Sequence, residues 1–159
     1  MAMITVRPAR PEDRDFLADG NEAMAIETEG RAPDRARLLA GVAGALSDAT
    51  KGRFFIAERD GRRVGQLLVQ REWSDWRNGW FWWIASVHVL PADRGSGVYR
   101  SLYAHIQALA HADPDVCGLR LYVEDHNQRA QAVYARLGMR DGQYRVYEED
   151  FRPLEPVAP

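Results

Sequence analysis

An almost uninterrupted apolar stretch in the middle of the chain constrains the fold more than any other feature. From residue 80 to residue 90 nearly every side chain is apolar or aromatic, which is typical of a central strand that is buried on both faces. Pro91 ends this strand, and a short loop containing Gly95 and Gly97 follows. The next apolar residues recur at helical spacing, at Val98, Leu102, Ile106 and Leu109. The sequence therefore predicts a buried strand that delivers a glycine-containing loop onto the start of a helix.

Further strands and helices are predicted on both sides of this segment. Apolar alternation or short apolar runs predict strands at residues 4–7, 54–58, 64–69, 119–124 and 144–151. Helical spacing of apolar residues predicts helices around residues 16–26, 34–51, 98–112 and 130–137. Asp60-Gly61 tolerates positive φ and therefore suits a tight hairpin between two of the strands. This order of elements predicts an α+β domain around a mixed sheet.

Composition limits the classes of protein to which the chain can belong. The chain has 159 residues, enough for one domain, and its 21 basic and 23 acidic residues give a formal charge of −2. It contains no basic block of the kind that neutralises phosphates, so nucleic acid is not an expected partner. The single cysteine, Cys117, excludes an internal disulfide framework, and no apolar run is long enough to span a bilayer. We therefore expect a cytoplasmic protein without a membrane partner, in which Cys117 is a packed, inert thiol.

The loop Arg94-Gly95-Ser96-Gly97 carries the first chemical signal. A loop that leads from a strand into a helix leaves backbone N–H groups unpaired and points the helix dipole at whatever binds there, which suits a phosphate. The glycines allow a close approach, and the Arg94 guanidinium can add charge-assisted hydrogen bonds. The pattern lacks the Gly-Lys-Ser/Thr of a P-loop and is not the dinucleotide fingerprint. Taken alone, it is also compatible with a purely structural turn.

Two motifs together resemble those of the GNAT superfamily of N-acetyltransferases, in an order of elements that covers nearly the whole chain. They are Val87-His88-Val89-Leu90-Pro91 with Arg94-Gly95-Ser96-Gly97-Val98-Tyr99, and Leu121-Tyr122-Val123-Glu124 with Asn127, Ala130, Tyr134 and Gly138-Met139. Tyr99 stands where that family usually has a small residue. Residues 21–29 and 72–77 further resemble a bacterial subgroup of the superfamily, which does not identify an acceptor.

The resemblance implies a GNAT fold. In this fold a mixed, mostly antiparallel central sheet splays between its two parallel middle strands, and about four helices flank it. It also implies a single acetyltransferase domain at residues 1–152, with a flexible C-terminal tail at residues 153–159.

The resemblance also implies an activity and a donor site. The expected activity is transfer of the acetyl group of acetyl-CoA to a primary amine of a small molecule or peptide, by direct attack in a ternary complex and without a metal. Tyr134 is the implied general acid. The implied coenzyme-binding residues are Val87, Val89, Arg94, Gly95, Ser96, Gly97, Val98, Tyr99 and Asn127. A non-catalytic sensor or partner subunit that binds acyl-CoA is the alternative function. At the level of residues, Asn127 could instead be only a helix N-cap, and Tyr134 only a core aromatic.

Two groups of residues are candidates for binding the acceptor. All five tryptophans fall between residues 73 and 83, and Trp73 and Trp76 lie in a predicted loop, where large aromatic side chains can attract a cation. For Trp80, Trp82 and Trp83, the alternative is that they pack under helices and that an exposed aromatic strand forms a homodimer interface. Glu27 and Glu29 lie at the junction of the first two helices, where they could hold a cationic amine or form only a solvated helix end. The general base stays unassigned between His88 and Glu124.

Overall fold

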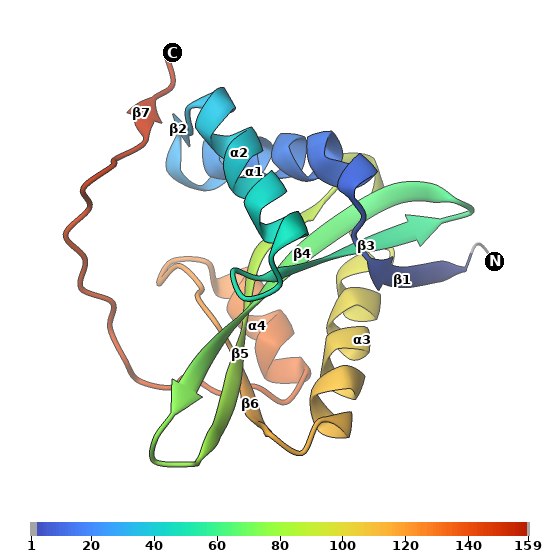
Figure 1. Cartoon of the computed structure of the whole chain (residues 1–159), viewed down its shortest axis with the longest axis vertical. Coiled ribbons are helices and arrows are strands. Elements are labelled where there is room, and N and C mark those ends of the chain that lie inside the picture. The colour runs from blue at the N-terminus through green and yellow to red at the C-terminus, as the bar shows by residue number, and fades with distance from the viewer. Residues whose placement is uncertain (1–2, 159) are drawn as a thin grey trace. The chain divides into compact units, whose positions relative to one another are not determined.

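Five strands form the main sheet of the protein, in the order β1-β3-β4-β5-β6 (Figure 1). They are β1 (Ile4–Pro8), β3 (Arg53–Arg59), β4 (Arg62–Ser74), β5 (Gly79–Val89) and β6 (Val116–Leu121). The pairs from β1 to β5 are antiparallel, and β6 runs parallel to β5. The computed structural model describes residues 3–158. Their contacts divide the chain into a larger unit, residues 3–120 with 154–158, and a smaller unit, residues 121–153.

Three helices belong to the larger unit: α1 (Arg14–Glu29), α2 (Arg35–Ser47) and α3 (Val98–Ala112). Leu17 of α1 and Val42 of α2 pack in one buried cluster with Phe54, Ile56 and Leu68 from the strands. The opposite face of the sheet lies against α3, because a Cβ placed on Gly65 of β4 would come within 2.7 Å of Val98. The sheet is therefore covered on both faces, as the apolar sequence of β5 predicts.

A close contact between helix and sheet explains the glycine in the middle of α1. The Gln66 side chain of β4 is fully buried and donates through Nε2 to Leu17 O and to Asn21 Oδ1. A Cβ on Gly20 would come within 2.2 Å of Gln66 Oε1. Glycine, which costs helix stability elsewhere, is required here because the amide occupies the space of a side chain.

A tight hairpin and a bulge shape the sheet. Asp60 and Gly61 connect β3 to β4 with φ angles of 51° and 76°, which confirms the predicted tight turn. In β5 the register shifts so that Ser86 and Val87 together lie opposite one residue of β4, and Ser86 has a φ of 49°. Such a bulge bends a strand and redirects its side chains. The bulge contains Val87 and precedes Val89, the two residues of β5 that the family resemblance implies as coenzyme-binding.

The smaller unit contains α4 (Gln128–Arg136), which confirms the last predicted helix. The strand predicted at residues 144–151 is wrong, because no regular structure occurs between residues 141 and 150. Tyr144 and Tyr147 are 81% and 88% exposed. Residues of high β-propensity form a strand only where a neighbouring strand supplies hydrogen bonds, and no such pairing is present for this segment.

A two-stranded ladder joins distant parts of the chain. β2 (Arg31–Ala32) pairs antiparallel with β7 (Glu155–Pro156), and the guanidinium of Arg31 donates to Leu154 O. The segment predicted as a flexible tail therefore lies, up to residue 158, against the junction between α1 and α2. The predicted domain boundaries themselves stay a prediction.

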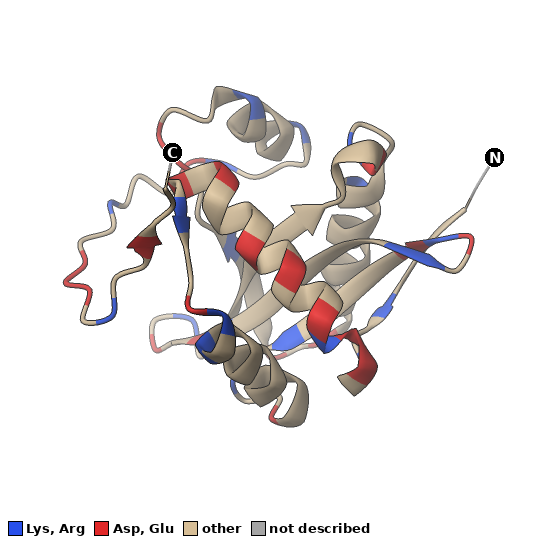
Figure 2. Cartoon of the chain, turned by 90° about the horizontal axis from the view of Figure 1, so that it is seen from above, with Lys and Arg blue, Asp and Glu red and all other residues tan. Residues whose placement is uncertain are grey.

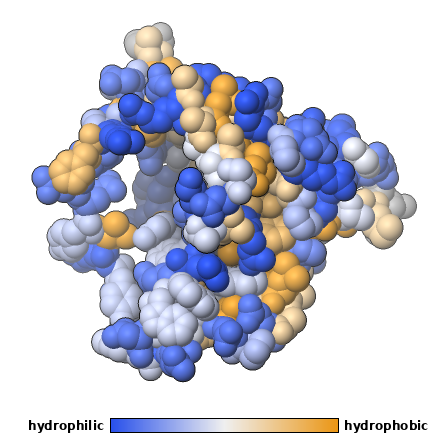
Figure 3. Space-filling view, viewed as in Figure 1, coloured by the Kyte–Doolittle hydropathy of each residue, from blue (hydrophilic) through white to orange (hydrophobic). Residues whose placement is uncertain are grey.

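The surface agrees with the charged composition. The face in Figure 3 is coloured mostly as hydrophilic, and most of its hydrophobic residues lie in the right half of the view. Among residues 3–158, no helix combines the length and the apolar character that a membrane crossing needs.

Candidate active site

The loop after β5 has the backbone geometry that an anion site needs. Gly95 and Gly97 adopt left-handed conformations, with φ angles of 73° and 87°. Gly97 is the N-cap of α3, and no side chain caps the N–H groups of the first helical turn. Uncapped N–H groups at a helix start, together with the helix dipole, favour a negatively charged ligand. The loop thus fits the phosphate-binding role that its sequence indicates.

A buried carboxylate fastens this loop to the β3–β4 hairpin. Asp93, which is 2% exposed, accepts hydrogen bonds from Arg59 at 2.7 Å and from Arg62 at 2.9 Å. Arg59 also donates to Ser96 Oγ at 2.6 Å. The hydroxyl of Ser96 in turn donates to the carbonyl of Asp93. Arg59 and Arg62 therefore bind the loop through Asp93, and the hydroxyl of Ser96 already forms hydrogen bonds within the protein.

The end of β5 presents backbone groups on its edge away from β4. Leu90 N–H donates to Val64 O of β4, so the alternation along a strand directs the peptide groups of Val87 and Val89 toward the other edge. There the Val89 carbonyl accepts a hydrogen bond from Arg94 Nε at 2.9 Å. Arg94 therefore bridges the loop and the strand.

Arg94 also contacts the end of α1. One of its terminal nitrogens lies 3.0 Å from both carboxylate oxygens of Glu27. The side chains of Arg94 and Glu27 are 44% and 45% exposed. The structure thus brings a predicted acceptor residue and a predicted coenzyme residue together in one ion pair. Glu29 is exposed and lies beside Gly30, the left-handed residue that ends α1.

Next to this pair lies a buried histidine. His88 is 7% exposed, and its Nε2 has no hydrogen-bond partner within the described chain. Burial lowers its pKa below the ordinary value of 6.5; Glu27 opposes this shift and Arg94 adds to it. The imidazole is therefore neutral at pH 7. His88 lies opposite Gln66 in the β4–β5 register, and Gln66 Oε1 likewise has no partner within the described chain.

The tryptophans lie in the half of the β4–β5 hairpin that contains its turn. Trp73 and Trp80 are register partners, and their rings meet edge to face at 5.0 Å. The guanidinium of Arg71 lies 4.5 Å from the Trp80 ring, and that of Arg53 lies 4.6 Å from the Trp82 ring. The rings of Trp80 and Trp82 therefore make cation–π contacts with arginines of the neighbouring strands.

Trp73 and Trp76 do not lie beside Glu27. Trp80, which pairs with Trp73, precedes Val89 by nine residues in β5, which corresponds to about 30 Å along a strand. Glu27 meets Arg94 at the Val89 end. Trp76 is 84% exposed in the turn at the far end. The four predicted acceptor residues thus form two separate groups.

The smaller unit holds the remaining predicted residues. Asn127 caps α4, and its Oδ1 accepts a hydrogen bond from Ala130 N–H at 3.1 Å. Tyr134 lies in the same helix, seven residues later, which is two helical turns. Glu124 lies in the turn before the helix, where its carbonyl accepts from Asn127 N–H and its carboxylate lies 3.5 Å from His126 Nε2. The N-cap role of Asn127 is thus present, and its coenzyme-binding role stays a prediction.

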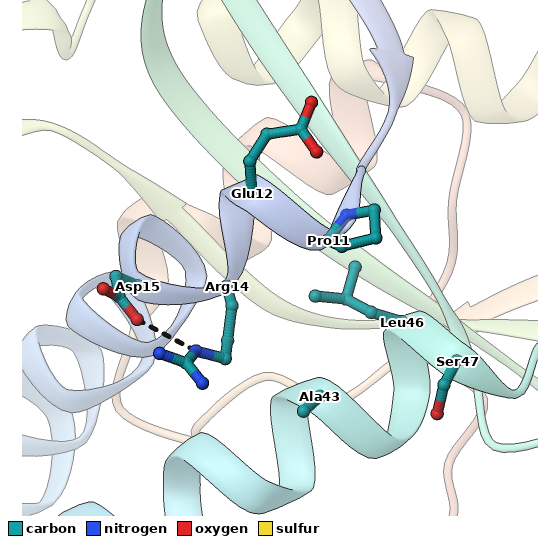
Figure 4. Close-up of a pocket in the computed structure, with 7 residues that line it drawn as sticks. All are labelled: Pro11, Glu12, Arg14, Asp15, Ala43, Leu46 and Ser47. Carbon is teal, nitrogen blue, oxygen red and sulfur yellow. Dashed lines mark hydrogen bonds and ion pairs between the residues drawn. The ribbon is translucent and has the colours of Figure 1, made fainter.

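A shallow hollow lies elsewhere on the larger unit (Figure 4). It is lined by Pro11, Glu12, Arg14, Asp15, Ala43, Leu46 and Ser47. These residues belong to the 3-10 turn η1 (Pro11–Asp13), to the beginning of α1 and to the end of α2. Arg14 precedes Glu27 by thirteen residues of helix, or about 20 Å. The hollow is therefore separate from the glycine loop.

The residues that fasten the loop were not identified from the sequence. In the sequence, Asp93 has only the pattern of a turn residue. Arg59 and Arg62 only flank the predicted hairpin. No local pattern connects positions more than thirty residues apart, so the hairpin register was needed to find them. Among the described residues, no cluster of His, Cys, Asp and Glu has the arrangement of a metal site.

An α+β domain whose central strand leads into such a glycine loop is typical of one family of proteins. The model of the acetyltransferase (GNAT) family matches residues 15–139. The chain therefore belongs to the GNAT family of acetyltransferases and is an acyltransferase. No curated protein sequence matches it significantly.

Solved structures share the fold over almost the full chain. A possible acetyltransferase from Clostridium difficile 630 is 38% identical, with a TM-score of 0.86 over 93% of this chain and 97% of that one. A predicted acetyltransferase with acetyl-CoA from Clostridium acetobutylicum is 18% identical, with a TM-score of 0.74 over 92% and 96%. An aminoglycoside N-acetyltransferase in complex with CoA is 16% identical, with a TM-score of 0.75 over 95% and 97%. These similarities confirm the predicted fold class.

Proposed function

We propose that this protein transfers the acetyl group of acetyl-CoA to a primary amine of a small molecule or peptide, by direct attack in a ternary complex. The observation that carries the proposal is the loop at residues 94–97, where two left-handed glycines lead into the uncapped start of α3. Membership of the acetyltransferase family supports it. So does the presence of acetyl-CoA or CoA in two structures of the same fold.

The coenzyme would contact four parts of this chain. Backbone N–H groups of Gly95 to Tyr99 and the Arg94 guanidinium would hold its pyrophosphate. The pantetheine arm would add to the free edge of β5 at Val87 and Val89, as an extra strand does. Asn127 would hold the same arm by its amide. In this arrangement Ser96 contributes its backbone, because its hydroxyl bonds to Asp93 and Arg59.

The chemistry requires proton transfer at both reacting partners. The neutral amine attacks the thioester carbonyl carbon, a C–N bond forms, and the C–S bond breaks. Tyr134 donates its phenolic proton to the departing sulfur and later regains a proton from water. The amine loses one proton to water, which balances the proton that Tyr134 regains, and the products are an acetamide and free coenzyme A. A backbone N–H at Val87 or Val89 would stabilise the negative charge on the carbonyl oxygen.

The acceptor contacts suggested by the geometry fall into two classes. Glu27 and Glu29 would bind the ammonium group of a small amine before it loses its proton. An acceptor that also contacts Trp73 or Trp76 would have to extend about 25 to 30 Å along the β4–β5 hairpin, which is the length of an extended peptide of about eight residues. The length of the best acceptor therefore distinguishes the two substrate classes.

Ligand-dependent stability is the direct test of the donor site. Thermal unfolding is measured with coenzyme A, acetyl-CoA and longer acyl-CoAs, and we expect about 2.7 kcal/mol of stabilisation at a hundredfold excess over Kd. Release of free thiol from acetyl-CoA is then measured across a panel of alkylamines, polyamines and peptides. No stabilisation by any of these coenzymes would overturn the donor assignment. Stabilisation without thiol release across the whole panel would show a binding protein in place of a transferase.

A further inference from the structure

The pairing of Glu27 with Arg94 connects the donor loop to the end of α1. Arg94 directs Nε to Val89 O and a terminal nitrogen to both oxygens of Glu27. Two residues separated by 67 positions thus neutralise each other at the place where the loop begins. Neither residue is buried, and half-exposed ion pairs contribute little, which corresponds to about fivefold or less in an equilibrium constant.

An anion bound to the loop would compete for Arg94. The pyrophosphate of the coenzyme carries two negative charges and presents several acceptor oxygens, and bidentate contacts between arginine and phosphate are among the strong hydrogen bonds in proteins. The Glu27 carboxylate on the same guanidinium would be repelled by that charge. A weak, half-exposed pair is easily exchanged under these conditions.

Among residues 3–158, Arg94 is the only cation that forms an ion pair with Glu27. Acidic residues recur along α1 (Figure 2), and most of them already have partners: Asp19 and Glu22 pair with Arg35, and Asp15 pairs with Arg14. The neighbouring His88 is buried, and its lowered pKa keeps the imidazole neutral at pH 7. Arg31, four residues after Glu27 and in β2, donates to the carbonyl of Leu154.

We propose that Glu27 exchanges partners during the reaction: it neutralises Arg94 in the absence of coenzyme, and it binds the ammonium group of the acceptor once the pyrophosphate engages Arg94. The proposal rests on the proposed function for its two ligands. Under it, Glu27 determines specificity for a cationic acceptor, and the site for that cation is complete only after the donor loop is occupied. The exchange is a binding step and alters no covalent bond.

Coenzyme binding tests the first half of the exchange without any acceptor. Titration calorimetry with coenzyme A compares the wild type with Glu27→Gln, which removes the competing charge. We expect a threefold to fivefold lower Kd for the variant. The gain should vanish in the Arg94→Gln background, and it should be absent for pantetheine, which lacks the pyrophosphate. Glu22→Gln, which removes a comparable pair with Arg35 from the same helix, serves as the control and should bind coenzyme A like the wild type.

Steady-state kinetics with the most active amine of the panel test the second half. Glu27→Gln should raise the KM of the amine about tenfold or more, while the KM of acetyl-CoA stays equal or falls. A purely structural role would change both constants in the same direction. Equal coenzyme affinity in wild type and Glu27→Gln, or an unchanged KM for the amine, overturns the proposal. Failure of the wild type to bind coenzyme A would instead overturn the proposed function.

Discussion

Asp93 Oδ1 lies 2.7 Å from Arg59 Nη1, and Asp93, just before the glycine loop, is almost completely buried. This contact joins the loop to the β3–β4 hairpin, which is otherwise remote from it in sequence. Arg62 adds a second cation to the same carboxylate. We therefore expect residues outside the motif to contribute to the conformation of the loop.

Replacement of Asp93 by asparagine should weaken both the fold and the donor site. Arg59, whose side chain is 20% exposed, would lose its charged partner, and a group left unsatisfied in this way costs about 1–3 kcal/mol. We expect that loss in urea unfolding, together with a Kd for coenzyme A raised about tenfold. Arg62→Gln is the control, because its side chain is 59% exposed and such pairs contribute about 0–1 kcal/mol. Wild-type coenzyme affinity in Asp93→Asn would show that the loop holds its conformation without this anchor.

Gly20→Ala and Gly41→Ala should have effects of opposite sign. Both glycines lie within helices, where alanine is better by about 0.5–1 kcal/mol when nothing opposes it. A Cβ on Gly41 meets no atom within 4 Å, so we expect this variant to be more stable. A Cβ on Gly20 would collide with the buried Gln66 amide, and such overpacking costs about 1–3 kcal/mol. Urea unfolding of the two variants side by side measures the difference, and stabilisation by Gly20→Ala would contradict the tight packing.

Local patterns were sufficient for most of the fold. The apolar run at residues 80–90 identified β5, and Asp60-Gly61 identified the hairpin before it. The glycine loop and the family resemblance both depend on short segments whose residues are close together in the sequence. Periodicity and turn chemistry act over such distances, and these predictions are confirmed.

Features that depend on distant contacts were predicted less well. Residues 144–151 have the composition of a strand, but composition does not supply a pairing partner. Glu27 was predicted to bind an acceptor, yet nothing in its neighbourhood indicated Arg94 as its ionic partner. Trp73 and Glu27 were both candidates for binding the acceptor, whereas the strand places Trp73 far from Glu27. In each case the deciding contact crosses many residues, and one sequence alone does not record it.

The stability of the protein should decrease as the pH falls below about 6.5 because of His88. Burial lowers the pKa of His88 in the folded state below 6.5, and the opposing effect of Glu27 is smaller. Between the pKa of His88 in the folded state and pH 6.5, the unfolded chain therefore binds more protons than the folded protein. The stability that is present above pH 6.5 is lost as the pH falls toward the folded-state pKa. The slope of the unfolding free energy reaches at most about 1.4 kcal/mol per pH unit for one group.

Urea unfolding of the wild type and His88→Phe at several pH values between 5 and 7.5 isolates this contribution. The substitution changes the absolute stability, but the comparison concerns only the slope, which should be smaller in the variant. Asp13 does not interfere. Burial alone would raise its pKa, but the hydrogen bonds from Arg7, from Arg10 N–H and from Arg63 keep it below 3.8. Equal slopes in both proteins would show that His88 does not titrate differently on folding.

Tyr134→Phe should separate binding from catalysis. The substitution removes only the phenolic hydroxyl, which the proposed mechanism uses to protonate the departing sulfur. We expect coenzyme A to bind with the wild-type Kd and thiol release to slow by about 10²-fold or more, the usual scale for a general acid. Tyr144→Phe is the matched control, because this exposed tyrosine lies in the same unit and should leave turnover unchanged. A Tyr134→Phe variant with wild-type turnover would exclude the tyrosine as the acid, and a proton from water would then have to protonate the thiolate.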